Sequence, residues 1–335
     1  MDRKKKRGML GALTLTFGLV LAGCGTDNGN SSESAQTQAA KAEPKSAAQS
    51  GETGRASMRA FDTAKGTVQI PDRPQRIVTD YYGGELIAAG LNVVGAAPLT
   101  FDNPFLKERL QDAEDAGQPL NTEKILELQP DLIVVMYDDS YEALSKIAPT
   151  VHIPFNTAKS VTETIALFSE LAGRPDDAKT LIDSFEQKGQ TAREALKSIV
   201  DERATIGIYE LVNDGTLWIF GENAGRGGQV FYNALGYRMP HPDPTGEQTL
   251  QLSMEMLPEY AADYMFLTVY DPDHTGQALR DLQELEIWKQ LPAVRNNRVF
   301  INDYDYWYPN DPLAVTGQID LAVDALTQRE AENAK

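Results

Sequence analysis

Short apolar runs alternate with amphipathic stretches along most of this chain. In the first half, the runs at residues 76–79, 93–96, 132–136 and 151–153 are rich in β-branched residues, and segments with helical spacing separate them. Runs that are apolar at consecutive positions predict strands buried on both faces, which is typical of a parallel sheet covered by helices. This half of the chain therefore predicts an α/β layer.

The same pattern returns in the second half of the chain. Runs at 204–209, 217–220, 264–269 and 299–301 predict a second set of buried strands. Such a chain is too long for one core, so the prediction is two α/β lobes with mostly parallel sheets and about 100–130 residues each. We place the first lobe at residues 58–158 and the second at 203–335.

No strand pattern occurs between the two predicted lobes. Residues 159–202 show only helical spacing of apolar positions, and Pro175 followed by Asp176 and Asp177 is a good helix start. A helix from Pro175 could continue for about 28 residues, or roughly 40 Å at 1.5 Å per residue. This predicts a long, rigid interlobe helix, and the alternative is a helical hairpin packed on one lobe.

A weak internal repeat relates the two predicted lobes. Asn121 and Glu123 have counterparts in Ser253 and Glu255, and in both copies an Asp eight positions after the Glu opens a strand. Locally, Asn121 and Ser253 can cap helices whose first turn holds the glutamate. Because one copy falls in each lobe, the repeat favours a pair of equivalent exposed acidic side chains over local stabilisation alone.

The start of the chain has the layout of an export signal. Residues 3–7 are basic, and an apolar run of about 14 residues follows and ends at Gly23-Cys24. This run is shorter than the roughly 20 residues that span a membrane, so a cleaved signal peptide at residues 1–23 is favoured. Residues 21–24 are similar to a bacterial lipobox, which predicts a lipid on Cys24. An ordinary cleaved signal is the alternative.

Composition agrees with an exported and anchored protein. Cys24 is the only cysteine, so the mature fold has no disulfide and depends on core packing. Residues 24–57 contain no large apolar side chain and predict a disordered tether behind the lipidated cysteine. The formal net charge is −18 at pH 7, and loss of the basic signal makes it more negative, which argues against nucleic acid as a partner.

The sequence lacks the common motifs of catalysis and metal binding. The sequence has no G-x-S-x-G, H-E-x-x-H, Walker-type loop or intact G-x-G-x-x-G, and its three histidines, His152, His241 and His274, are scattered. We therefore predict a binding protein with no enzymatic activity, no cofactor and no metal ligands of its own. An exported α/β hydrolase and a structural surface lipoprotein are the alternatives from other classes.

These features together resemble the siderophore-binding proteins of Gram-positive ABC importers, which have the class III substrate-binding fold. The resemblance covers nearly the whole mature chain and is strongest to the iron–hydroxamate branch, through segments 80–86, 103–106, 146–151, 225–228 and 292–299. It implies a monomeric receptor, lipid-anchored on the outer face of the cell membrane, that captures a ferric hydroxamate siderophore and delivers it to the permease. Catecholate siderophores, haem and cobalamin are alternative cargoes.

The resemblance also assigns roles to residues. One glutamate per lobe docks on the permease in this family, and motif position makes these Glu123 and Glu255. The ligand lies between the lobes, where Arg226 matches a family arginine. Ala224 stands where hydroxamate binders often have Trp, and Gln229 stands where an acidic residue is common.

Aromatic side chains complete the expected site. The cluster around Trp307 resembles a family segment that lines the cleft, and Tyr82 and Tyr137 follow strands at the ligand-facing end of a parallel sheet. A ferric siderophore already surrounds its iron with six oxygens, so its receptor needs flat aromatic surfaces and arginine donors. The residues predicted to contact the ligand are Arg226, Trp218, Phe220, Trp307, Tyr306, Tyr308, Tyr82 and Tyr137.

Overall fold

The computed structural model describes residues 57–240 and 248–335. All of them belong to one compact unit, Gly54–Lys335. The predicted signal peptide, the predicted lipidation site Cys24 and the predicted tether up to residue 56 lie outside the described residues. Within the described ranges, no helix combines the length and the apolar character that a membrane span requires.

The first lobe is built on a five-stranded sheet in the order β5-β4-β3-β6-β7, and all its neighbouring strands are parallel. The strands of this sheet are β3 (Ile77–Thr79), β4 (Val93–Ala96), β5 (Glu114–Asp115), β6 (Leu132–Val135) and β7 (Thr150–His152). Its helices are α1 (Gly83–Ala88), α2 (Pro98–Phe101), α3 (Thr122–Leu128) and α4 (Tyr141–Leu144). An antiparallel hairpin of β1 (Met58–Thr63) and β2 (Gly66–Pro71), which the sequence analysis does not anticipate, precedes them.

The second lobe contains a mixed sheet in the order β10-β9-β8-β11-β12. Its strands are β8 (Ile206–Val212), β9 (Leu217–Phe220), β10 (Thr249–Leu252), β11 (Tyr264–Tyr270) and β12 (Val299–Asp303). The other elements are the π-helical turn η1 (Gln229–Ala234), α7 (Gln277–Glu284), α8 (Glu286–Lys289), α9 (Pro292–Arg295), α10 (Tyr304–Trp307) and α11 (Pro312–Asn333). The two-lobed α/β prediction is therefore confirmed.

Only part of the second sheet is parallel. β11 pairs in parallel with β8 and β12, whereas β9 pairs antiparallel with β8 and β10. The reason is the short turn between β8 and β9, where Gly215 has a φ of 87° and the N–H of Val212 donates to the carbonyl of Thr216. A turn this short can join only antiparallel strands.

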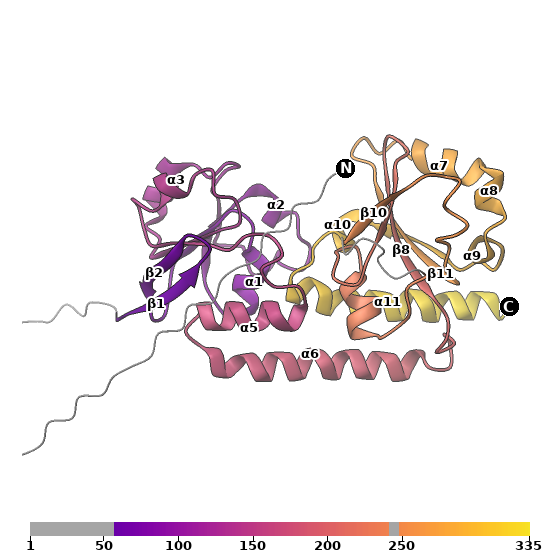
Figure 1. The fold of residues 1–335 in the computed structure, drawn as a ribbon, viewed down its shortest axis with the longest axis horizontal. Helices are drawn as coiled ribbons and strands as arrows, with labels where there is room; N and C mark the ends of the chain where they lie inside the picture. The colour runs from indigo at the N-terminus through magenta and orange to yellow at the C-terminus, as the bar shows by residue number, and fades with distance from the viewer. Residues whose placement is uncertain (1–56, 241–247) are drawn as a thin grey trace, which may run out of the picture. The chain divides into compact units, whose positions relative to one another are not determined.

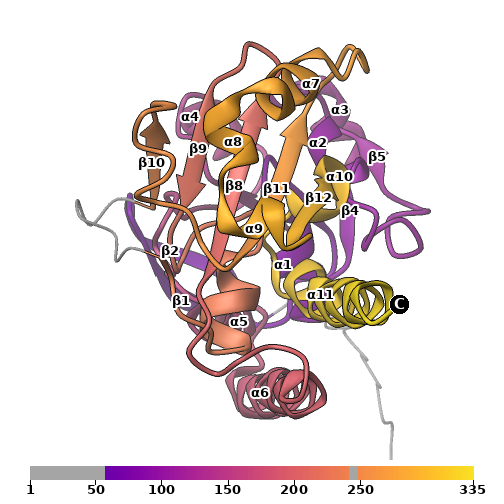
Figure 2. The same ribbon diagram turned by 90° about the vertical axis from the view of Figure 1, so that its right-hand side faces the viewer.

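Two helices, α5 (Val161–Leu171) and α6 (Pro175–Leu196), connect the lobes. α6 has 22 residues, or about 33 Å, and so is shorter than expected, because the chain turns where Ile199 and Val200 donate to the carbonyl of Leu196. Figures 1 and 2 show α6 running beneath both α5 and α11. It packs tightly on η1, since a Cβ on Gly189 would lie 2.7 Å from the carbonyl oxygen of Ala234.

The helix α5 is shared by the cores of both lobes. Its first half contributes Val161 and Ile165 to the apolar core of the second lobe. Its second half contributes Phe168 and Leu171 to the core of the first lobe. The α5–α6 pair is therefore not a hairpin packed on one lobe.

The helix α11 makes a second connection between the lobes. Its N-cap residue, Asp311, accepts a hydrogen bond from Asn103 of the first lobe at 2.8 Å. Phe105 packs so closely on α11 that a Cβ on Gly317 would lie 2.3 Å from the ring. Leu313, in the first turn of α11, packs on the core of the first lobe. The helix α11 thus joins the lobes in addition to the α5–α6 pair.

The internal repeat has a structural basis. Asp131 accepts the backbone N–H groups of Gln75 and Arg76, just before β3, and Asp263 accepts that of Thr205, just before β8. Each Asp therefore ties the start of one central strand to that of its neighbour.

The two copies of the repeat differ in the helix that was expected to follow the polar cap. Asn121 caps α3 by accepting the N–H groups of Glu123 and Lys124, as predicted. The corresponding helix after Ser253 is absent and the prediction is wrong there, because residues 254–259 form successive turns. Pro258 has no N–H with which to continue a helix.

Candidate functional site

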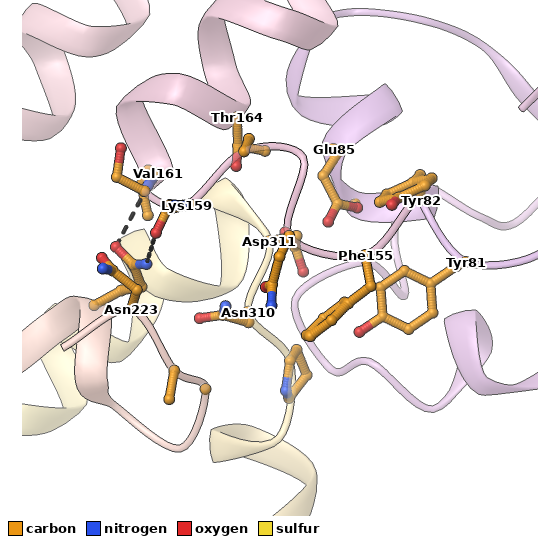
Figure 3. A pocket seen from close by; sticks show the side chains of 18 of the residues that line it. Tyr81, Tyr82, Glu85, Phe155, Lys159, Val161, Thr164, Asn223, Asn310 and Asp311 are labelled. Atoms are coloured by element: carbon orange, nitrogen blue, oxygen red, sulfur yellow. Dashed lines mark hydrogen bonds between the residues drawn. The ribbon is translucent and has the colours of Figure 1, made fainter. Parts of the chain in front are cut away.

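A cavity of about 1070 Å³ lies between the two lobes. Its wall in the first lobe comes from the start of α1 and from the loop that follows β7, residues 153–160. Its wall in the second lobe comes from residues 222–226, after β9, and from residues 308–311, before α11. The volume is sufficient for a small-molecule ligand with a large organic shell. Figure 3 shows part of this lining.

Arg226 is held rigidly at the wall of the cavity. Its Nε donates to the carboxylate of Glu210, and the two side chains are only 13% and 11% exposed. The guanidinium lies 4.4 Å from the ring centroid of Tyr308, 5.2 Å from that of Tyr304 and 5.3 Å from that of Phe220. A buried ion pair and three aromatic faces therefore fix a group that can still donate hydrogen bonds from its other nitrogens.

The backbone also contributes to the position of Arg226. The residue has a φ of 62°, in the left-handed region, and its N–H donates to the carbonyl of Trp307 at 3.1 Å. A non-glycine residue in this region is uncommon and costs about 1 kcal/mol or more. The surrounding contacts offset this cost and aim the side chain at the cavity wall.

Two carboxyl groups meet where the lobes approach each other. Glu85, in the first turn of α1, and Asp311, the N-cap of α11, both line the cavity. Burial and the nearby charge of Asp311 raise the pKa of Glu85 to about 8. Burial also raises the pKa of Asp311, but Asp311 accepts the N–H groups of Leu313 and Ala314 as well as the Asn103 amide, and these hydrogen bonds oppose the shift by favouring its ionised form. The proton that the pair retains near neutral pH is therefore assigned to Glu85.

A third carboxyl group, Asp80, lines the cavity at the end of β3. Burial raises its pKa to about 6, although the backbone N–H groups of Met136 and Tyr137 donate to it at 2.8 Å and 3.1 Å. Asp80 thus holds the loop after β6 against the end of β3.

Tyr81 and Phe155 line the cavity and are missing from the sequence prediction. Tyr81 stacks edge-on against Tyr82 with their centroids 5.4 Å apart, and Figure 3 shows the ring of Phe155 beside that of Tyr81. Phe155 is 60% exposed in the loop after β7. The signal that selected Tyr82, an aromatic residue following a parallel strand, applies equally to both residues.

Four of the eight residues predicted to contact a ligand line the cavity: Arg226, Phe220, Tyr308 and Tyr82. Tyr82 does so only marginally, because it is buried against Phe168 and its hydroxyl donates to the carbonyl of Ile153 at 2.7 Å. Tyr304, which was not predicted, contributes indirectly through its contact with Arg226.

The other four predicted residues lie elsewhere. Trp307 is 4% exposed and stacks on Phe231 in the core of the second lobe, with the centroids 5.7 Å apart. The reason is the short helix α10, which places Tyr304 and Tyr308 on the side of Arg226 and turns Trp307 inward. We therefore correct the prediction that Trp307 lines the site.

The remaining three have simple local explanations. Trp218 shares a strand face with Phe220 but lies two residues further from the strand end, where it packs against the core of the second lobe. Tyr306 is exposed and packs edge-on against Phe105. Tyr137 is exposed beyond the end of β6. None of these three side chains is part of the cavity lining in the described ranges.

Gln229 and Ala224, the two residues that depart from the family pattern, are both buried. The side-chain amide of Gln229, at the start of η1, donates to the carbonyl of Lys159 and accepts from the N–H of Val161. These two hydrogen bonds attach η1 to the segment that connects the lobes. An acidic side chain could accept but not donate there. Ala224 is buried in the cavity wall, and its small side chain leaves space that a Trp would fill.

The repeat glutamates are far more accessible than the carboxyl groups in the cavity. Glu123 and Glu255 are both exposed. The hydrogen bonds that Glu255 accepts from its own N–H and from Ser253 lower its pKa. Within the described residues, no group of three or more His, Cys, Asp and Glu side chains could hold a metal ion.

Comparison with known proteins gives one consistent result. The family model for periplasmic binding protein matches residues 85–306. The iron(3+)-hydroxamate-binding protein YxeB of Bacillus subtilis is 45% identical over 338 residues, which cover 99% of this chain and 100% of the relative. The iron(3+)-hydroxamate-binding protein FhuD of B. subtilis is 31% identical over 277 residues, which cover 80% of this chain and 86% of the relative.

A solved structure agrees with these relatives. The FhuD fold-family periplasmic binding protein component of a Fep/Fec-like ferrichrome ABC transporter from B. subtilis superposes with a TM-score of 0.72 at 30% identity. The match covers 80% of this chain and 99% of that one. The two-lobed arrangement described above is therefore shared with a protein of known structure.

Proposed function

This chain belongs to the periplasmic binding protein family, and from that premise we propose that it is the receptor of an ABC importer for ferric siderophores of the hydroxamate type. It is a binding protein and not an enzyme. The similarity to an iron(3+)-hydroxamate-binding protein over the full length of both chains supports this function.

The observation that carries the proposal is the fixed guanidinium of Arg226 at the wall of a large interlobe cavity. In a ferric hydroxamate, six oxygens surround the iron and carry partial negative charge outward. A guanidinium can donate to several of these oxygens without displacing them from the metal. The rings of Tyr308, Phe155 and Tyr81 offer flat apolar area to the organic shell around the chelate.

Binding titrations test the cargo directly. We expect quenching of tryptophan fluorescence to give affinities at least tenfold higher for ferric trihydroxamates than for ferric catecholates, haem or cobalamin. The iron-free hydroxamates are the matched control, since they lack the compact chelate that the cavity is proposed to enclose. A preference for any other cargo on this panel would refute the hydroxamate assignment, and turnover of simple esters or phosphates would refute the function.

Delivery to the permease is proposed to depend on Glu123 and Glu255. Both are exposed, and they occupy equivalent positions in the sequence repeat, with one copy in each lobe, so a pair of basic sites on the partner could engage them together. Reversing both charges in Glu123→Arg/Glu255→Arg should leave siderophore affinity within about twofold and reduce iron uptake by cells at least tenfold. Neither residue lines the cavity.

The control for this experiment is a double reversal of the same size at exposed positions outside the repeat, Glu186→Arg/Glu202→Arg. This control should retain uptake, because it changes the net charge equally without touching the proposed docking sites. Normal uptake by the Glu123→Arg/Glu255→Arg cells would show that the docking assignment is mistaken.

The remaining parts of the proposal concern location. We propose that Cys24 carries the lipid anchor, that residues 25–57 link it to the folded unit, and that a monomer works at the outer face of the cell membrane. The lipobox-like sequence at residues 21–24 supports the anchor.

A further inference from the structure

The charged side chains that line the cavity are mostly acidic, although the cavity contains Arg226. The positive charge of Arg226 is already neutralised by Glu210. Of the other charged side chains that line the cavity in residues 57–240 and 248–335, only Lys159 is basic, whereas Asp80, Glu85, Glu222 and Asp311 are acidic. An incoming ligand therefore meets a wall with an excess of negative charge.

Among the acidic side chains of this wall that are not exposed, Glu85 has the fewest partners. Asp80 accepts two backbone N–H groups, and Asp311 accepts two backbone N–H groups and the Asn103 amide. In the described part of the chain, the only donor to the Glu85 carboxyl is its own backbone N–H, and no cation pairs with it. Glu222 is exposed at the rim, where solvent and salt screen its charge.

The packing of α11 against α1 places Asp311 close to Glu85. Residue 84, which precedes Glu85, is a glycine, and a Cβ on Gly84 would lie 2.2 Å from Cγ of Asp311. Only a residue without a side chain at position 84 allows α11 to place its capping carboxylate against α1. Figure 3 shows the Glu85 and Asp311 side chains on facing elements at the cavity.

Two partly desolvated carboxyl groups in such proximity repel each other and cannot both ionise without cost. A cation placed beside them would favour release of the proton that Glu85 holds near neutral pH and would donate hydrogen bonds to two ionised carboxylates in its place. On the proposed function of this cavity, we infer that Glu85 is a specificity-determining residue that makes the receptor prefer ferric siderophores bearing a cationic group. A chelate with a net negative charge is disfavoured by the same wall.

The test uses two ligands that differ only in that group. One is a linear ferric trihydroxamate that ends in a primary ammonium, and the other is the same chelate with the amine acetylated. At pH 7.5 the unmodified protein should bind the ammonium form about tenfold or more tightly than the acetylated form. In Glu85→Gln, the ratio of the two affinities should fall to about two or less.

The matched control is Glu186→Gln, which changes the net charge equally on the exposed face of α6 and should keep the tenfold ratio. Equal affinity of the unmodified protein for both chelates, or a ratio that survives Glu85→Gln, would overturn this inference and leave the proposed function intact. Failure of the unmodified protein to bind either chelate would overturn both. Because the first comparison needs no variant, the result does not depend on the folding of Glu85→Gln.

Discussion

Removing the Arg226 side chain should weaken the binding of a ferric trihydroxamate by about 100-fold or more. The guanidinium is fixed by Glu210 and by the rings of Phe220, Tyr304 and Tyr308, so it loses little freedom when it donates to the chelate. Each hydrogen bond to a charged donor contributes roughly 1.5–3 kcal/mol, and two of them correspond to at least two orders of magnitude in affinity. Calorimetric titration measures the loss.

The experiment is best done in a Glu210→Gln background. Arg226→Ala alone would leave the Glu210 carboxylate buried and unpaired and would destabilise the fold by about 3–5 kcal/mol. A loss of binding could then result from unfolding. The comparison is therefore Glu210→Gln against Glu210→Gln/Arg226→Ala. Arg203→Ala in the same background is the control, since the Arg203 side chain is 87% exposed. A loss smaller than tenfold would remove Arg226 from the proposed ligand contacts.

Replacing Glu85 by glutamine should stabilise the protein at alkaline pH, and the gain should disappear in acid. The pKa of Glu85 is raised from its ordinary value of 4.5 to about 8 by burial and by the charge of Asp311. A carboxyl group with a raised pKa favours the folded state fully below pH 4.5, and this contribution is lost as the pH rises through 8. The neutral amide of Gln does not titrate.

Chemical denaturation at a series of pH values checks this result. The unfolding free energy of Glu85→Gln should exceed that of the unmodified protein by roughly 2–4 kcal/mol at pH 9 and by a few tenths at pH 4. Glu186→Gln, at an exposed position of α6, should show no such dependence. A difference between Glu85→Gln and the unmodified protein that stays constant from pH 4 to pH 9 would contradict the pairing of Glu85 with Asp311.

The sequence pattern was sufficient for the architecture but not for every strand. Consecutive apolar residues located the parallel strands of both lobes except β5, because burial on both faces leaves no polar positions. β5 consists of two exposed acidic residues, so no apolar run marks it. The hairpin of β1 and β2 was missed, since few of its residues are buried and its apolar and polar residues alternate only weakly. The mixed character of the second sheet depends on the turn at Gly215, a local feature that the apolar pattern does not report.

Prediction of the site was limited by side-chain direction and by distant contacts. Arg226, Phe220 and Tyr308, which line the cavity, were found because their segments resemble family segments that line the cleft. The prediction for Trp307 was wrong because adjacent residues of α10 point in different directions, one toward the core and the next toward the cavity. Asp311 contacts residues of the first lobe such as Asn103, which is 208 positions away in the sequence. No local sequence pattern encodes such a contact.

The sharing of α5 and α11 between the two cores has a consequence for how the protein loses its structure. Melting of the first lobe would remove the apolar partners of the second half of α5 and of Leu313 in α11. Melting of the second lobe would remove those of the first half of α5 and of Val315 and Ile319 in α11. Each lobe therefore stabilises elements that the other requires, and partial denaturation of one half is disfavoured. The folded unit should behave as a single cooperative body, with one transition for both halves, even though it contains two sheets.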